Sequence, residues 1–289
     1  MSNRPFWENS IGNGFWESAG GHESPSSFEA WIAHSTFPIE KGWVRVKLSL
    51  MRIAVVQCFN ILDDARLAGD AIVERLLWAE EEGIDLTLFP ESFLLGHTYD
   101  PETIRSRASV AASAIPALCE RVAAIRSTLV VGAFDLADGQ VFNSAIIIEA
   151  GRVVGRYSKA HPNEPGVTAG SDFPTFLRSG VRYGVNICND ANHPGPAQRI
   201  ADQDARLILY PLNNMLRSET ADRWREKSLA ILIDRARQTG CWVASADVTG
   251  TSGNLVSYGC TAIVTPEGSV VARVPELQEG VTVYDVPPC

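Results

Sequence analysis

The sequence predicts one α/β domain that begins near residue 51. From Met51 onward, short apolar runs typical of strands alternate with longer amphipathic segments typical of helices. This alternation implies apolar strands covered by helices, and the mixture of crossovers with hairpins implies a mixed sheet or sheets. Functional sites in such folds lie at the C-terminal ends of strands, so the residues that follow each strand are the first candidates for a site.

Several elements can be assigned in the first half of the domain. The predicted elements are a strand at 51–58, a helix at 64–83, a strand at 84–91, a helical region at 101–127, and strands at 128–136, 141–151 and 152–159. The first helix keeps its apolar side chains on one face and closes at Gly83. Pro101 favours the start of the second helical region, whereas Pro116 predicts a break within it. A turn at Ala150 and Gly151 pairs the last two strands as a hairpin.

The second half repeats the theme. Its predicted elements are a strand at 181–188, a helix at 196–205, a strand at 206–213, a helix at 220–240, and strands at 241–248, 258–268 and 281–286. Pro194 and Pro196 mark the start of the first of these helices. The sequence therefore predicts that both halves belong to one domain spanning residues 51–289.

Residues 1–50 differ from the rest of the chain. They are rich in Gly, Ser, Asn and Trp, show no sustained periodicity, and carry the near-repeat FWENS and FWESA. We interpret them as an N-terminal extension that is poorly ordered or peripheral. Two alternatives stay open: the tryptophans form a partner-binding tail, or the natural chain starts at Met51.

Composition and charge exclude several function classes. With 289 residues, 45% hydrophobic and 20% charged, the chain can bury a large core. The net charge of -9 and the lack of a dense basic run argue against nucleic acid and membrane surfaces as partners. The six scattered cysteines form no C-x-x-C pair, which predicts reduced thiols, no zinc site and a cytoplasmic protein. Neither an apolar run long enough to span a bilayer nor a secretory signal is evident.

Three chemically useful side chains come at the ends of predicted strands: Glu91, Lys159 and Cys188. Each has an ordinary interpretation, as a surface-turn carboxylate, a solvated lysine and a small core residue. Each also has a catalytic one. Burial would make Glu91 a usable base, an inward lysine would stabilise an oxyanion, and a thiolate is best stabilised at a strand-to-helix turn. Their occurrence at equivalent strand ends favours a nucleophile, a base and a cation in one site.

The motifs around these residues resemble the nitrilase or carbon-nitrogen hydrolase superfamily, in order and spacing, over about residues 51–286. The segments that carry the resemblance are MRIAVVQ, LTLFPESFLLG, GRYSKAH, YGVNICND, DARLILYPLN and SYGCTAIVTPEGSVV. The resemblance implies a four-layer αββα sandwich, which in this family commonly assembles into homo-oligomers. No metal and no organic cofactor are implied.

The resemblance also assigns roles to residues. It implies that Glu91 is the general base, Lys159 the oxyanion-stabilising cation and Cys188 the nucleophile, with the backbone N–H of Asn189 as a second oxyanion donor. Glu164 fits the place of a second, supporting glutamate. The implied reaction is two-step acyl transfer from a small-molecule amide or N-carbamoyl substrate through a cysteine thioester.

The turn after the nucleophile departs from the better-known subgroups. Many amidase-like members read D-x-R-x-P-E there, whereas this chain reads DANHPG at residues 190–195. The Trp-Glu pair of many nitrilases is also missing, which disfavours a nitrile. His193 in this turn and Asn213 after the next strand are candidates for substrate contacts. A nitrilase, an acyltransferase with the same triad, and a catalytically idle binding module remain as alternative functions.

Overall fold

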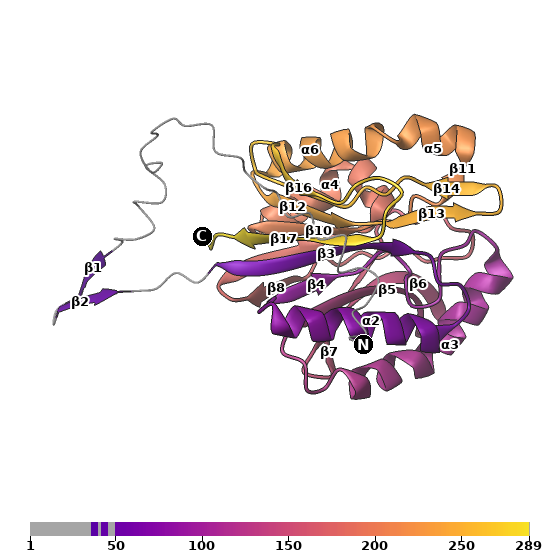
Figure 1. The fold of residues 1–289 in the computed structure, drawn as a ribbon, viewed down its shortest axis with the longest axis horizontal. Helices are drawn as coiled ribbons and strands as arrows, with labels where there is room; N and C mark the ends of the chain where they lie inside the picture. The colour runs from indigo at the N-terminus through magenta and orange to yellow at the C-terminus, as the bar shows by residue number, and fades with distance from the viewer. Residues whose placement is uncertain (1–35, 40–41, 46–49, 289) are drawn as a thin grey trace, which may run out of the picture.

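We describe the fold from a computed structural model, in which residues 36–39, 42–45 and 50–288 are described (Figure 1). Within the predicted extension, β1 (Thr36–Ile39) and β2 (Gly42–Arg45) pair as a two-stranded antiparallel sheet. Residues 1–35 lie outside the described residues, so the predicted character of the extension stays a prediction.

Two large sheets build the domain. The nine-stranded sheet has the order β11-β14-β13-β3-β4-β5-β6-β7, with β17 also pairing with β3. Its strands are β3 (Met51–Phe59), β4 (Leu86–Leu88), β5 (Thr128–Ala137), β6 (Gln140–Glu149), β7 (Arg152–Ser158), β11 (Leu216–Arg217), β13 (Val248–Ser252), β14 (Leu255–Ser257) and β17 (Gly280–Val286). Strands β3, β4 and β5 run parallel, and β6 and β7 continue as antiparallel hairpins.

The six-stranded sheet has the order β16-β15-β12-β10-β9-β8. Its strands are β8 (Thr175–Arg178), β9 (Val181–Val185), β10 (Leu207–Pro211), β12 (Trp242–Ala246), β15 (Ala262–Val264) and β16 (Val270–Arg273). The central strands β9, β10 and β12 are parallel, whereas β8, β15 and β16 are antiparallel to their neighbours. The prediction of a mixed sheet or sheets is therefore confirmed.

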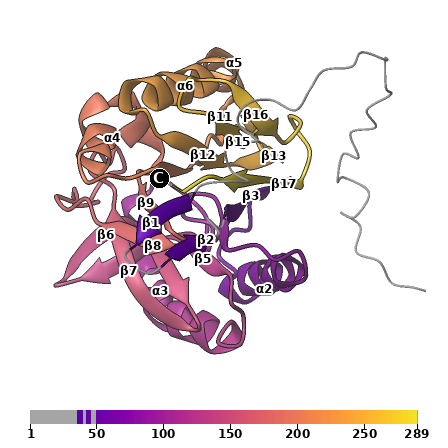
Figure 2. The same cartoon turned by 90° about the vertical axis from the view of Figure 1, so that its left-hand side faces the viewer.

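Helices cover the outer face of each sheet, which gives the predicted four-layer αββα sandwich. Figures 1 and 2 show α2 (Ala65–Glu81) and α3 (Pro101–Arg121) on one side, and α4 (Pro194–Ala201), α5 (Ser218–Trp224) and α6 (Lys227–Thr239) on the other. The three largest apolar clusters among the described residues follow from these layers. One lies between the two sheets, and each of the others lies between a sheet and its helices.

Local capping explains where the helices begin and end. Asp64 and Asp100 are N-caps whose carboxylates accept from the backbone N–H three residues later. Gly240 closes α6 with a left-handed backbone at φ 65°. The predicted break at Pro116 is wrong, because α3 continues through it. Burial of Ile115 and Leu118 on either side compensates for the one hydrogen bond that proline cannot make.

Two other predicted elements are divided in the structure. The predicted helix at 220–240 is two helices, α5 and α6, separated at Arg225 and Glu226, whose side chains are exposed. The predicted strand at 241–248 is also divided, because Asp247 separates β12 of one sheet from β13 of the other. In the sequence, Asp247 is the one acid in this run, and a single acid does not reveal the change of sheet.

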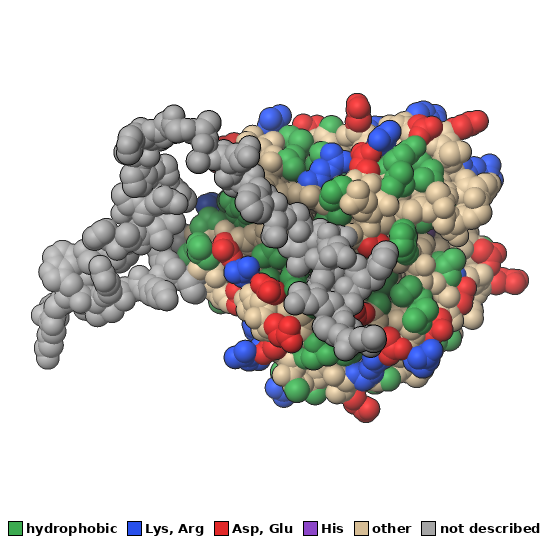
Figure 3. Space-filling view, in the orientation of Figure 1, with side chains coloured by type: hydrophobic (Ala, Val, Ile, Leu, Met, Phe, Trp, Pro, Cys, Tyr) green, Lys and Arg blue, Asp and Glu red, His purple; other side chains and the backbone are tan. Residues whose placement is uncertain are grey.

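Charged side chains of both signs lie on the surface. Acidic and basic side chains are interspersed on the face seen in Figure 3, over both layers of helices. Among the described residues, no helix combines the length and the apolarity needed to cross a bilayer.

Candidate active site

The Glu91 carboxylate enters the interior from the loop that follows β4. Its side chain is 1% exposed, and its backbone N–H donates to the Leu212 carbonyl at 3.1 Å. That bond ties the β4 loop to the segment after β10, so two sheets meet at this residue. Glu91 thus lies at the C-terminal ends of parallel strands, as the fold class predicted.

Lys159 comes directly after β7 and is equally buried, at 1% exposed. Its Nζ lies 2.7 Å from Glu91 Oε1 and 2.8 Å from Glu164 Oε1. The structure therefore brings the predicted base, the predicted cation and the predicted second glutamate together in one buried cluster. Two carboxylates around one ammonium satisfy a charge that would otherwise be costly to bury.

Two further residues complete this cluster. Asn143, in the middle of β6, donates its Nδ2 to Glu91 Oε1 and to Glu164 Oε1, both at 2.8 Å. His97, from the loop after Glu91, lies with its Nε2 2.9 Å from Glu164 Oε1. Neither residue was predicted from the sequence. For Asn143 a signal was present, because Asn143 and Ser144 are polar residues between apolar residues of the strand.

The Cys188 thiol lies at the turn where β9 passes into a short 3-10 helix, η2 (Cys188–Asn192). Its backbone has a φ of 41°, a left-handed conformation that residues other than glycine seldom adopt. Asp190 holds this turn in place. It accepts from the Ile187 N–H at 2.9 Å, the Tyr157 hydroxyl at 2.8 Å and the His161 N–H at 2.8 Å.

Burial raises the pKa of the Cys188 thiol well above its usual value, and the negative charge of Glu91 raises it further. Lys159 and the backbone N–H of Asn213 act in the opposite direction and do not outweigh these effects. The Cys188 side chain is therefore a neutral thiol at neutral pH. A thiol of this kind must lose its proton to a base as it attacks.

Unlike the thiol, Lys159 and Glu164 stay charged although they are buried. Burial alone would lower the pKa of Lys159, but Glu91 and Glu164 raise it. Burial would raise the pKa of Glu164, but the hydrogen bond from His97 and the charge of Lys159 lower it well below its usual range. Lys159 is thus an ammonium, and Glu164 is an ionised acceptor at neutral pH.

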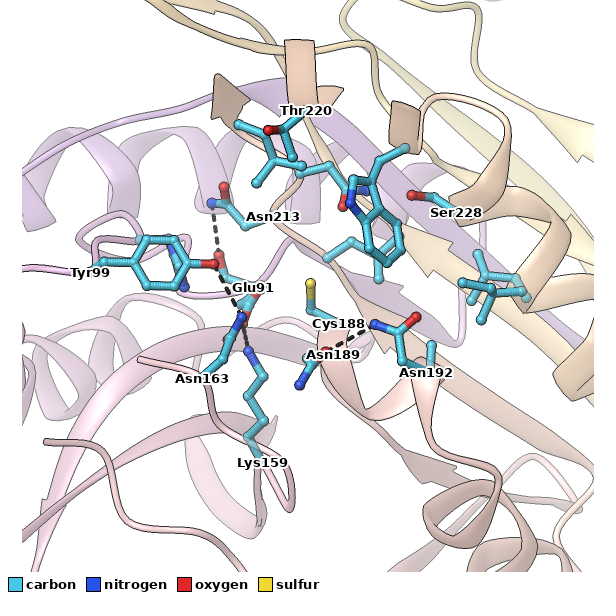
Figure 4. A pocket seen from close by; sticks show the side chains of 18 residues that line it. Glu91, Tyr99, Lys159, Asn163, Cys188, Asn189, Asn192, Asn213, Thr220 and Ser228 are labelled. Atoms are coloured by element: carbon cyan, nitrogen blue, oxygen red, sulfur yellow. Dashed lines mark hydrogen bonds and ion pairs between the residues drawn. The ribbon is translucent and has the colours of Figure 1, made fainter. Parts of the chain in front are cut away.

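Two atoms of the cluster are left for chemistry. Glu91 Oε2 is buried and has no hydrogen-bond partner among the described residues. The Lys159 ammonium has three donors and uses two of them on Glu91 and Glu164. A free carboxylate oxygen and a spare cationic donor therefore lie in the same cavity as the thiol (Figure 4).

The cavity has a volume of about 260 Å³ and two kinds of wall. Leu212, Leu216, Trp224, Ile231 and Leu232 form an apolar side. Apart from the thiol, Glu91, Lys159 and His97, most of the remaining wall is neutral and polar: Tyr99, Asn163, Asn189, Asn192, Asn213, Asn214, Thr220 and Ser228. Figure 4 shows most of these side chains around the cavity. Among the described residues that line it, no arginine occurs, and Lys159 is the one lysine.

The remaining predicted residues lie in different places. Asn189 lines the cavity, and at the first turn of η2 its N–H has no intrahelical acceptor, as an oxyanion donor requires. Asn213 also lines it, although its Nδ2 contacts the Glu91 carbonyl at 3.4 Å. His193 is exposed, stacks on His161 with ring centroids 3.8 Å apart and lies outside the lining residues. Its predicted contact with substrate stays a prediction.

A buried acid behind the cavity was also missed. Asp247 accepts from Asn214 N at 3.0 Å, from Asn214 Nδ2 at 2.7 Å and from Cys260 N at 2.9 Å. Its complete burial raises its pKa to about 6. Asp247 therefore fixes the orientation of Asn214 at the wall. In the sequence, the only signal was an acid in a run of small apolar residues.

The cluster also contains three side chains of the kinds that bind metal ions. Glu91, His97 and Glu164 each offer one ligand atom, and these atoms lie within 4.8 Å of one another. Lys159, however, donates to one oxygen atom of each carboxylate. A divalent cation held by both carboxylates would lie beside this ammonium, so the donor set fits a lysine-centred cluster better than a metal site.

Comparison with known proteins extends this picture. Residues 39–288 match the family model described as Carbon-nitrogen hydrolase. A protein from Pseudomonas protegens, described as "Hydrolase in pqqF 5'region", is 29% identical over 77% of this chain and 78% of its own length. Glutamine-dependent NAD(+) synthetase from Xanthomonas campestris is 29% identical to this chain. The match covers 76% of this chain and 41% of that longer enzyme. A crystal structure of an amidase from Nesterenkonia sp. has a TM-score of 0.73 and 25% identity, covering 84% of this chain and 92% of that one.

Proposed function

The chain belongs to the carbon-nitrogen hydrolase family, and from this premise we propose that it is an amidase that hydrolyses small neutral amides through a thioester on Cys188. One observation carries the proposal. The unpartnered Glu91 Oε2, the ammonium of Lys159 and the thiol lie in one cavity, so each chemical requirement of acyl transfer has an atom to meet it.

In the first half-reaction, the Cys188 sulfur attacks the amide carbonyl carbon while its proton passes to Glu91 Oε2. An S–C bond forms, and the carbonyl oxygen becomes an oxyanion held by the spare Lys159 donor and the Asn189 N–H. Glu91 then gives the proton to the amide nitrogen, the C–N bond breaks, and ammonia or an amine leaves.

In the second half-reaction, a water molecule attacks the thioester carbon and its proton passes to Glu91. The C–S bond breaks, the carboxylic acid leaves, and the proton returns to the Cys188 sulfur. The neutral thiol of Cys188 supports this order of events, because a base must take the thiol proton in the first half-reaction and a proton of water in the second.

The cavity supports a small neutral substrate over a carboxylated one. At about 260 Å³ it is smaller than the pockets that take drug-sized ligands, which begin at about 300 Å³. The described lining offers no arginine to pair with a carboxylate, and Lys159 is already held by two acids. An N-carbamoyl amino acid or glutamine would therefore bury an unpaired charge.

The test is ammonia release from acetamide, propionamide and butyramide, compared with glutamine, N-carbamoylalanine and the matching nitriles. We expect turnover of the simple amides by the wild type and none by Cys188→Ala. Equal release from the two proteins would rule out the thiol mechanism. Adding hydroxylamine tests acyl transfer, since a hydroxamate would then form in place of the acid. Binding without turnover would instead favour a catalytically idle module.

A further inference from the structure

His97 occupies a position that the mechanism above does not use. Its Nε2 lies 2.9 Å from Glu164 Oε1, and its side chain is 8% exposed. Two aromatic rings restrain the imidazole. Tyr99 meets it edge-on with centroids 5.0 Å apart, and Phe134 lies at 5.8 Å. A histidine held in this way has one fixed direction for its hydrogen bond.

The state of Glu164 decides which way that bond runs. Glu164 Oε1 already accepts from Asn143 and from Lys159, and its Oε2 accepts from the Asn163 N–H at 2.9 Å. A carboxylate of lowered pKa has no proton to give, so it can only accept. His97 must therefore carry a proton on Nε2 and donate it.

The contact has a consequence for Lys159. Glu164 is one of the two carboxylates that hold the ammonium, and it is held in turn by His97 and Asn143. Without the imidazole, Glu164 Oε1 loses one of its three hydrogen-bond donors and keeps Asn143 and Lys159. The carboxylate would then be held less firmly, by Asn143, Lys159 and the Asn163 N–H alone, and it would take up a proton more readily.

We propose that His97 is a positioning residue, whose Nε2–H fixes the Glu164 carboxylate so that Lys159 stays between Glu164 and Glu91. This inference rests on the proposed amidase function for its kinetic readout. It assigns His97 no contact with the reacting atoms. The hydrogen bond is a charge-assisted one, which is typically worth enough to change a rate about 10- to 100-fold.

The test compares two substitutions that differ in one property. His97→Phe keeps a flat ring between Tyr99 and Phe134 but removes the donor. His97→Gln supplies an amide N–H to Glu164 instead. We expect kcat to fall about 10- to 100-fold in the phenylalanine variant with KM nearly unchanged, and to recover most of its value in the glutamine variant.

The pH profile separates positioning from a merely structural role. The charged or titratable groups around His97 are Glu91, Glu164, Lys159, Tyr99 and, through the Gly96 carbonyl, Arg107. Of the acids, Glu164 loses a hydrogen bond in His97→Phe, so its pKa rises. In the proposal, only ionised Glu164 holds Lys159 in place, so protonation of Glu164 lowers activity. The acid limb of kcat/KM must therefore move to higher pH in His97→Phe and stay in place in His97→Gln.

Three results would overturn the proposal: equal kinetic losses in both variants, an acid limb that does not move, or a rise in KM at constant kcat. The last would make His97 a substrate contact. Failure of the amidase function itself is recognised separately, by alkylating Cys188 with iodoacetamide in each protein, with Cys188→Ala as background. If no amide is turned over, the proposal still requires slower alkylation in His97→Phe than in His97→Gln.

Discussion

Gly132 controls the position of the candidate base, and replacing it with alanine tests that control. Gly132 lies in β5, directly under the loop that carries Glu91. A Cβ atom added there would lie 2.2 Å from Ser92 N, 2.8 Å from the Glu91 carbonyl carbon and 2.8 Å from Pro90 O. All three are backbone atoms, so no flexible side chain can yield. Ser92 itself has a φ of 50°, which leaves this loop little freedom to refold.

The size of the effect follows from the contact distances. Carbon atoms pack at about 3.5 Å, so the loop must move by roughly 1 Å to admit the methyl group. A displacement of this size at a catalytic group costs about 100-fold in kcat. Overpacking of this kind also destabilises a fold by about 1 to 3 kcal/mol. We therefore expect Gly132→Ala to remain folded and to hydrolyse amides about 100-fold more slowly.

Steady-state ammonia release and thermal unfolding measure the two effects. Gly195→Ala is the matched control, because a Cβ atom there meets nothing within 4 Å. Its kcat should equal that of the wild type. A Gly132→Ala protein with wild-type kcat would refute the reasoning, since the loop would then tolerate a methyl group without displacing Glu91.

Three further predictions concern the groups around the site. Asp190→Asn removes an acceptor from the nucleophile turn, and we expect it to lower the free energy of unfolding by about 1 to 3 kcal/mol and to slow alkylation of Cys188. Asp247 has a pKa of about 6 in the folded protein against 3.8 ordinarily, so the folded protein takes up a proton at Asp247 at a higher pH than the unfolded chain does. This group therefore adds about 2 kcal/mol to the stability of the fold as pH falls from 7 to 4. Trp224→Ala should raise KM for butyramide about 5- to 30-fold and leave acetamide nearly unaffected, because the indole forms part of the apolar wall.

A separate assay tests each of these three predictions, and a specific result would contradict each one. Alkylation at the wild-type rate in Asp190→Asn would show that the turn holds its shape without that acceptor, and exposed Asp202→Asn is the control. For Asp247, unfolding free energies are compared with those of Asp247→Asn between pH 4 and 7, and parallel curves would contradict the prediction. Equal changes in KM for both amides would place Trp224 away from the acyl group.

The fold and the main site residues could be predicted because they depend on local pattern. An apolar run that ends in a polar residue identifies the end of a buried strand, as it does before Glu91 and Cys188. Lys159 instead follows β7, a mostly exposed strand whose end is indicated by the turn residues after it. Parallel strands then bring their C-terminal ends to one edge, whatever lies between them in the sequence. The contact between Lys159 and Glu164 could also be anticipated, because only five residues separate them.

The residues that were missed depend on distant partners. His97 and Glu164 are 67 residues apart, and Asn143 and Glu91 are 52 apart, so no local pattern links either pair. The division of the predicted helix at 220–240 is of the same kind. At its interruption, Arg225 pairs with Glu276 and lies over the Tyr258 ring, and both partners come from a later part of the chain. Local helix propensity cannot report such contacts.

The turn that carries Cys188 shows how the fold holds a strained backbone conformation in place. A residue other than glycine at positive φ costs on the order of 1 kcal/mol, and Cys188 is such a residue, at 41°. Asp190 opposes that cost with bonds from the turn itself and from β7 and the Lys159 loop. The same carboxylate thus links the segments that carry the thiol and the cation. The strain persists because relaxing Cys188 would break these hydrogen bonds and leave their buried donors without an acceptor.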